Sequence, residues 1–157
     1  MSNLEWTQHT EDAPEGLLLH GDVAVVAGLA GWGETVPGSE TPALPNTTPD
    51  VIKLLREQGL QVEMAVDRNQ ASEVSLNNAD LWVPVVIFAA DVAAGGGGSL
   101  LADALRHLVP LPRRRSTNLH VRFGTETRKG KVSWFEAHGP AQDVLDAIER
   151  HRDSDDG

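Results

Sequence analysis

The stretch that decides the fold is residues 79–109, which read ADLWVPVVIFAADVAAGGGGSLLADALRHLV. The side chains from Leu81 to Ala94 are almost all apolar, on every side of any regular conformation, so we expect this run to be buried. In the segment that follows, the apolar residues recur with the spacing of one helix face: Leu100, Leu101, Ala104, Leu105 and Leu108. The sequence therefore predicts a buried element followed by an amphipathic helix.

The conformation of residues 81–94 depends mainly on Pro84. A helix that starts near residue 80 tolerates a proline close to its first turn, whereas proline disfavours a central strand. We therefore predict a central apolar helix over 81–94, with a fully buried strand as the alternative. A membrane span needs about 20 apolar residues, and this run is shorter and contains Asp91.

Residues 95–99 read GGGGS. Four consecutive glycines predict a break between the two elements, because glycine gains little from regular structure. The same five letters form the usual engineered flexible linker, so both a native turn and an inserted linker agree with the sequence.

Composition restricts the classes of function. The chain has 157 residues, which agrees with one domain, and a formal net charge of -10. An acidic field repels phosphate backbones, so we do not expect nucleic-acid binding. Cysteine is absent from the sequence, which excludes disulfides and thiolate metal sites and agrees with a cytoplasmic location.

Residues 1–48 are predicted to form an N-terminal extension. Its acidic opening to Glu15 is expected to be mobile. The Val-rich residues 17–27 predict one buried strand or a hairpin, and the prolines of residues 34–48 predict a connecting loop.

The α/β domain is predicted over residues 49–151. Thr48-Pro49 is typical of a helix start, Gly59 of a helix end, and residues 60–66 alternate as a half-buried strand does. Residues 119–137 predict an antiparallel hairpin, and residues 140–151 predict a helix that covers one face of it. This is a small two-layer α/β (α+β) domain, and we predict that residues 152–157 are disordered.

The order of elements from Gly59 onward resembles the effector-associated constant component family, small accessory proteins of bacterial conflict systems. The residues that carry this resemblance of layout are 60–66, 81–109, 113–115, 119–123 and 132–148, a little over half of the chain. The resemblance implies an adaptor that couples a sensor to an effector such as a trypsin-like protease, as in antiphage defence. That family has no catalytic residues to carry over.

Three side chains of the hairpin are the candidate metal ligands. His138 and Glu136 lie two apart on the second strand, and we expect His120 to stand opposite them, so nitrogen and carboxylate ligands for zinc could meet. The alternatives are a small metal-dependent hydrolase, which would use this trio, and a solvated polar face without chemistry. No nucleophile elbow or other catalytic motif is present in the sequence, which favours a non-catalytic protein without a cofactor.

The candidate partner-binding residues lie on the same hairpin face and in one cluster. Trp134, Arg122 and His120 point away from the face that carries the phenylalanines, and we expect Trp134 to be exposed and stacked on Arg122. The alternative is that residues 17–27 cover this face as added strands, or that the first helix packs on it, and that Trp134 is core. Arg113, Arg114 and Arg115 are candidates for an acidic protein partner or, alternatively, for a peripheral membrane surface. The sequence thus predicts an adaptor or assembly module that binds a protein effector or itself.

Overall fold

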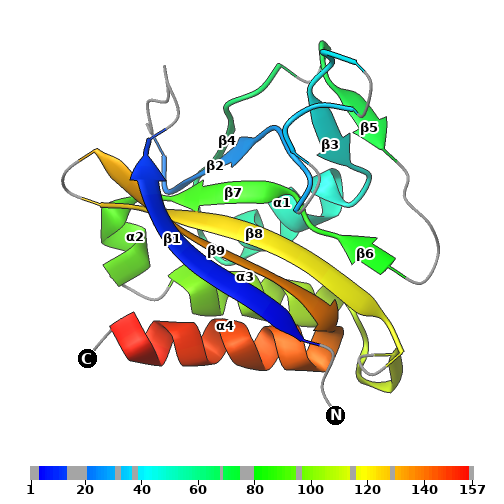
Figure 1. The fold of residues 1–157 in the computed structure, drawn as a ribbon, viewed down its shortest axis with the longest axis vertical. Helices are drawn as coiled ribbons and strands as arrows, with labels where there is room; N and C mark the ends of the chain where they lie inside the picture. The colour runs from blue at the N-terminus through cyan, green and yellow to red at the C-terminus, as the bar shows by residue number, and fades with distance from the viewer. Residues whose placement is uncertain are drawn as a thin grey trace.

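The computed structural model of the protein describes residues 4–13, 21–30, 33–36, 39–67, 69–74, 80–94, 97–113, 116–127 and 130–155. It confirms a mixed α/β fold in which helices pack on one face of a sheet (Figure 1). The seven-stranded sheet has the order β1-β9-β8-β7-β2-β4, and β6 pairs with β8 next to β7.

The bounds of these seven strands show that the sheet draws on most of the chain. They are β1 (Glu5–Asp12), β2 (Val23–Val26), β4 (Val62–Met64), β6 (Asp80–Trp82), β7 (Val85–Phe88), β8 (Asn118–Glu126) and β9 (Lys131–Pro140). The predicted strands at 17–27 and 60–66 correspond to β2 and β4, and the predicted hairpin corresponds to β8 and β9. Residues 14–20 lie outside the described part of the chain. The division at residue 48 stays a prediction, while β1 and β2 join the same sheet as the later strands.

In the part of the chain that the structure describes, four α-helices accompany the sheet: α1 (Thr48–Glu57), α2 (Ala90–Ala94), α3 (Gly97–Leu108) and α4 (Ala141–Asp155). A short 3-10 turn, η1 (Leu111–Arg113), follows α3. The predicted helix start is displaced by one residue: α1 begins at Thr48, its N-cap is Thr47 without a side-chain cap hydrogen bond, and the Thr48 hydroxyl instead donates to the carbonyl of Pro45 at 2.6 Å. Gly59 follows α1 with a φ of 90°, a left-handed conformation that favours glycine. A second, two-stranded sheet pairs β3 (Ala43–Pro45) with β5 (Ser72–Val74).

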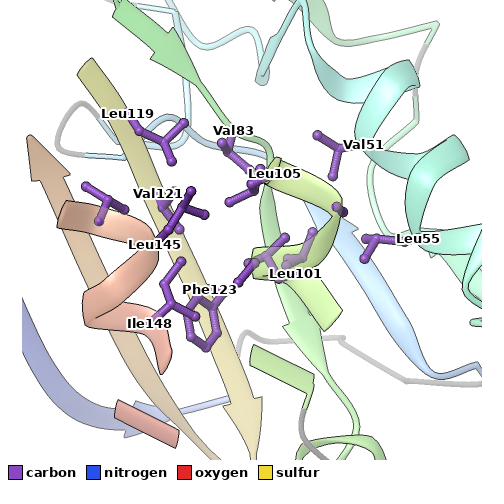
Figure 2. Close-up of a cluster of buried hydrophobic side chains, with 14 of the residues drawn as sticks. Val51, Leu55, Val83, Leu101, Leu105, Leu119, Val121, Phe123, Leu145 and Ile148 are labelled. Atoms are coloured by element: carbon purple, nitrogen blue, oxygen red, sulfur yellow. The ribbon is translucent and has the colours of Figure 1, made fainter. Parts of the chain in front are cut away.

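The main core lies between the sheet and the helices (Figure 2). Leu101 and Leu105 of α3 and Leu145 and Ile148 of α4 are fully buried there, together with Phe123 of β8. The apolar face predicted for α3 is thus confirmed. At about 25 cal/mol per Å² of apolar area, this burial is the main source of stability for a chain without disulfides.

The prediction of a helix over 81–94 is wrong for most of its length. Residues 80–88 form β6 and β7, and only residues 90–94 are helical. Both strands run parallel to β8, one after the other, so they act as a single strand interrupted at Val83 and Pro84. Proline lacks an N–H group and is therefore accommodated at the interruption. No helix in the described residues is long and apolar enough to cross a membrane.

Both ends of the chain are more regular than the sequence predicted. The acidic segment before Glu15, expected to be mobile, contains the eight-residue strand β1. Helix α4 continues to Asp155, so the prediction of disorder from residue 152 is wrong for residues 152–155. For β1, pairing with β9 overrides a polar composition.

The glycine-rich segment takes part in the helical layer. Helix α3 begins at Gly97, so the chain is helical through part of the predicted break. The space beside Gly98 is bounded by Phe123 and Ile148, each 3.6 Å from the point where a Cβ would stand. Ser99 donates from its hydroxyl to Glu149 of α4 at 3.1 Å. These contacts tie residues 97–99 to the surrounding core.

Candidate functional site

The hairpin presents its polar side chains on the face of the sheet opposite α3 and α4. Residues of β8 alternate between buried Leu119, Val121 and Phe123 and partly exposed His120 and Arg122. The β8–β9 register places His120 opposite His138, and Arg122 opposite Glu136. The sequence therefore predicted correctly that these residues share one face, which we call the outer face (His120, Arg122, Trp134, Glu136 and His138).

Trp134 is on the outer face beside Arg122, as predicted, but it is not exposed. The guanidinium carbon of Arg122 lies 4.3 Å from the centroid of the indole, which confirms the cation–π contact. Yet Trp134 is 4% exposed and packs in a second, smaller cluster with Val85, Ile87 and Val132. The expectation that Trp134 is exposed is therefore wrong, and the alternative of a core residue holds, because Val85 and Ile87 of β7 supply apolar neighbours on this face. Its role in partner binding stays a prediction.

Gly124 makes room for the indole of Trp134, which stands opposite it on β9. A Cβ at Gly124 would lie 3.1 Å from two ring atoms of Trp134 and 2.4 Å from Cγ1 of Val132. The ring thus lies across the strand in space that only glycine leaves open. The indole Nε1 is buried without a hydrogen-bond acceptor in the described part of the chain, a state that costs roughly 1–3 kcal/mol.

His120 is held between an aromatic ring and a carboxylate. The ring of Trp82 stacks on it with the centroids 3.9 Å apart and an interplanar angle of 4°. Asp80 Oδ2 lies 3.2 Å from His120 Nε2, and the other oxygen of Asp80 accepts from the Asn118 amide. Burial lowers the pKa of His120 below its usual value and outweighs the opposing effect of Asp80; the charge of His138 lowers it further. Near neutral pH this histidine is therefore uncharged.

The three candidate metal ligands share a face but do not form a metal site. The rings of His120 and His138 stack with centroids 5.5 Å apart, and His138 Nε2 contacts Glu5 Oε2 at 2.9 Å. Glu136 instead faces Arg122 at 4.0 Å. Among the described residues, no group of three His, Cys, Asp or Glu side chains is placed to hold a metal ion. The three side chains therefore belong to a row of polar contacts across β8, β9 and β1.

The arginine cluster is placed in part. Arg113 ends the 3-10 turn η1, whereas Arg114 and Arg115 lie outside the described residues. The segment 81–94, which the membrane alternative would insert into lipid, contains β6, β7 and α2, and β7 is buried in the sheet.

Sequence reasoning missed the edge strand β1. β1 pairs with β9 along one side over Glu5–Asp12, and all eight of its residues are exposed. The N–H of Ala13 donates to the carbonyl of Gly130, which fixes the alternation of the ladder: odd-numbered residues of β1 bond to β9, and even-numbered residues direct their N–H and C=O groups outward. The outward groups are those of Trp6, Gln8, Thr10 and Asp12.

Trp6 adds an apolar side chain to this open edge. Its ring stacks on Phe135 with centroids 6.1 Å apart, on the face of the sheet that carries the helices. Its side chain is nevertheless 55% exposed, and with Leu111 it is one of the exposed large apolar residues of the described chain. A half-covered tryptophan next to unpaired backbone groups is typical of a protein-binding edge.

The opposite edge of the sheet, which β4 forms, is less accessible to an added strand. β4 has three residues, and Arg56 of α1 donates to the outward carbonyl of Val62 at 3.1 Å. Beside it lies a groove of about 470 Å³ that is lined by Pro49, Ile52, Lys53, Arg56, Glu57 and Met64. A short strand covered by a charged side chain resists pairing with another chain. Among the described residues, the long edge without a neighbouring strand is therefore that of β1.

No family model, no curated protein and no solved structure matches this chain.

Proposed function

We propose that the protein is a non-catalytic adaptor that binds partner proteins by adding a strand to the free edge of β1. The observation that carries this proposal is the outward backbone of Trp6, Gln8 and Thr10 in a strand that is exposed along its whole length. An extended segment of a partner gains main-chain hydrogen bonds at such an edge, and side-chain pockets add specificity.

The side chains of the outer face support a non-catalytic function. The three candidate metal ligands each contact a different neighbour. His120 contacts Asp80, Glu136 contacts Arg122, and His138 contacts Glu5. Buried stacking holds His120 in place. The alternative of a metal-dependent hydrolase would need at least three ligands that converge on one point, and this arrangement does not supply them in the described residues.

Strand addition places only a general requirement on the effector. An adaptor with a free edge accepts any extended segment that can pair with it, and the resemblance of layout to the effector-associated family agrees with such a coupling role.

Photocrosslinking in cells tests the proposal. A photoreactive residue at Thr10 stands on the outward edge, and a second one at Glu57 of α1 serves as the matched surface control. Gln8→Pro removes one outward N–H group without removing a bond to β9, whereas Gln8→Ala keeps that N–H group. We expect protein adducts at Thr10 that are lost with Gln8→Pro and kept with Gln8→Ala. Adducts that are absent, or that persist with Gln8→Pro, would contradict strand addition.

A further inference from the structure

We infer that the occupant of the β1 edge is β1 of a second copy of the chain, bound antiparallel across a two-fold axis at Thr7. The inference rests on the proposed function of β1 as the binding element and names its partner. Two-fold dimers are the commonest oligomers, and the two surfaces of such an interface are the same patch. The patch must therefore complement itself, which can be examined residue by residue.

The charges of β1 and the coverage of Trp6 together favour one register. In an antiparallel pair the residues opposite each other share a face, so even positions meet even ones and odd positions meet odd ones. If Gln8 met the partner's Gln8, Glu5 would face the partner's Glu11, and two pairs of like charges would result. If His9 met the partner's His9, Trp6 would face the partner's Asp12. Both registers place unfavourable pairs between the two β1 strands.

The register centred on Thr7 removes these conflicts. Glu5, which contacts His138 in its own chain, then faces the partner's His9, and by symmetry His9, which contacts Glu11 in its own chain, faces the partner's Glu5. Two networks of opposite charge across the dimer result when the histidines are protonated. Glu11 and Asp12 fall beyond the paired segment. The outward N–H and C=O groups of Trp6 meet those of the partner's Gln8. The even-numbered residues, whose backbone groups point away from β9, therefore bond to each other across the two strands.

This register also covers Trp6. Residues diagonal to each other across an antiparallel pair lie roughly 7–8 Å apart, within reach of aromatic side chains. Trp6 and the partner's Trp6 occupy such diagonal positions. The two rings would lie on the helix-bearing face, where each already stacks on its own Phe135. The 55% of Trp6 that is exposed in one chain thus gains an apolar neighbour.

Sedimentation measures the assembly directly. The wild-type chain, whose mass is 16.9 kDa, is expected to sediment with twice that mass at high micromolar concentration. Gln8→Pro is expected to sediment as one chain, with a melting temperature in dilute protein equal to that of the wild type, and Gln8→Ala as a dimer. A wild-type mass of one chain would overturn the inference. If adducts of other proteins still form at Thr10 in cells, that result leaves strand addition as the function and removes the second copy as its partner.

Single cysteines report the register, because the natural sequence contains none. Residues that face each other in a non-hydrogen-bonded pair have Cα atoms about 4.5 Å apart, within the range that a disulfide spans. Thr7→Cys is therefore expected to form a covalent dimer on mild oxidation, and a mixture of Glu5→Cys with His9→Cys a mixed one. Gln8→Cys and His9→Cys alone are expected to remain uncrosslinked. Crosslinking of either of these in preference to Thr7→Cys would overturn the two-fold axis at Thr7.

Discussion

Arg122 lies over the indole of Trp134 with its guanidinium carbon 4.3 Å from the ring centroid, on the sheet face opposite the helices. The pair connects two strands of the hairpin, because Arg122 belongs to β8 and Trp134 to β9. Burial of the ring makes this contact part of the stability of the sheet. Free charge–ring pairs at a surface contribute about 0.5–1 kcal/mol, and desolvated ones more.

The first prediction concerns the size and polarity of Trp134. Trp134→Ala should lower the free energy of unfolding by about 3–5 kcal/mol, as expected for a large aromatic side chain in a core. Trp134→Phe should cost far less, because it keeps an aromatic ring and removes the buried Nε1 that has no acceptor in the described chain. Urea denaturation measures both. A loss below about 1 kcal/mol for Trp134→Ala would place the ring at the surface.

The second prediction concerns the crowded surroundings of Gly124. Gly124→Ala should destabilise the protein by about 1–3 kcal/mol through overpacking, since its Cβ would stand 2.4 Å from Cγ1 of Val132. Adding Val132→Ala removes that atom, so the double variant should lose less stability than the two single changes together.

Gly98→Ala is the matched control for Gly124→Ala. Its Cβ would meet its neighbours at 3.6 Å, an ordinary contact, and alanine favours the helix over glycine by up to about 1 kcal/mol. We therefore expect Gly98→Ala to leave the melting temperature unchanged or to raise it. Equal destabilisation at both positions would show that Gly124 is not specially crowded.

The third prediction concerns pH. Burial lowers the pKa of His120 in the folded protein, so the unfolded chain takes up this proton at a higher pH than the folded one. The stabilisation that follows from this difference in pKa is fully present above about pH 6.5, the ordinary pKa of histidine. It is lost as the pH falls from there through the lowered pKa of the folded state. Unfolding free energies measured from neutral to acidic pH should show this loss in the wild type and a smaller one in His120→Gln. An NMR titration of His120 with a pKa above 6.5 would contradict it.

The local patterns of the last third predicted the structure well. The alternation of Leu119, Val121 and Phe123 determined which face of β8 is buried, and the helix stripe of Val144, Leu145 and Ile148 determined which face α4 covers. From these two facts the common face of His120, Arg122 and Trp134 follows. The cation–π contact was therefore accessible from the sequence.

The sequence left Trp134 open between surface and core, because its burial depends on the conformation of another stretch. A short apolar run gives no periodicity that separates a buried strand from a buried helix. Once residues 85–88 are a strand, Val85 and Ile87 point to the outer face and pack against Trp134. The error in the central run thus produced the error in the binding surface.

The edge strand was missed for a different reason. Glu5 to Asp12 is exposed on both faces, so it lacks the alternation that marks a half-buried strand. Its conformation comes from pairing with β9 and from cross-strand contacts such as that of Glu5 with His138. Such long-range terms leave no signal in a polar stretch of sequence.

Amide hydrogen exchange of β1, resolved residue by residue, tests the central claim most directly. In dilute protein the amides of Thr7 and His9, which bond to β9, should exchange slowly, while those of Trp6, Gln8 and Thr10 should exchange fast. At high protein concentration the amides of Trp6, Gln8 and Thr10 should become protected as the edge is paired. Amides at these three positions that exchange equally fast at every concentration, or that are already protected in dilute protein, would contradict a free edge that binds a second strand.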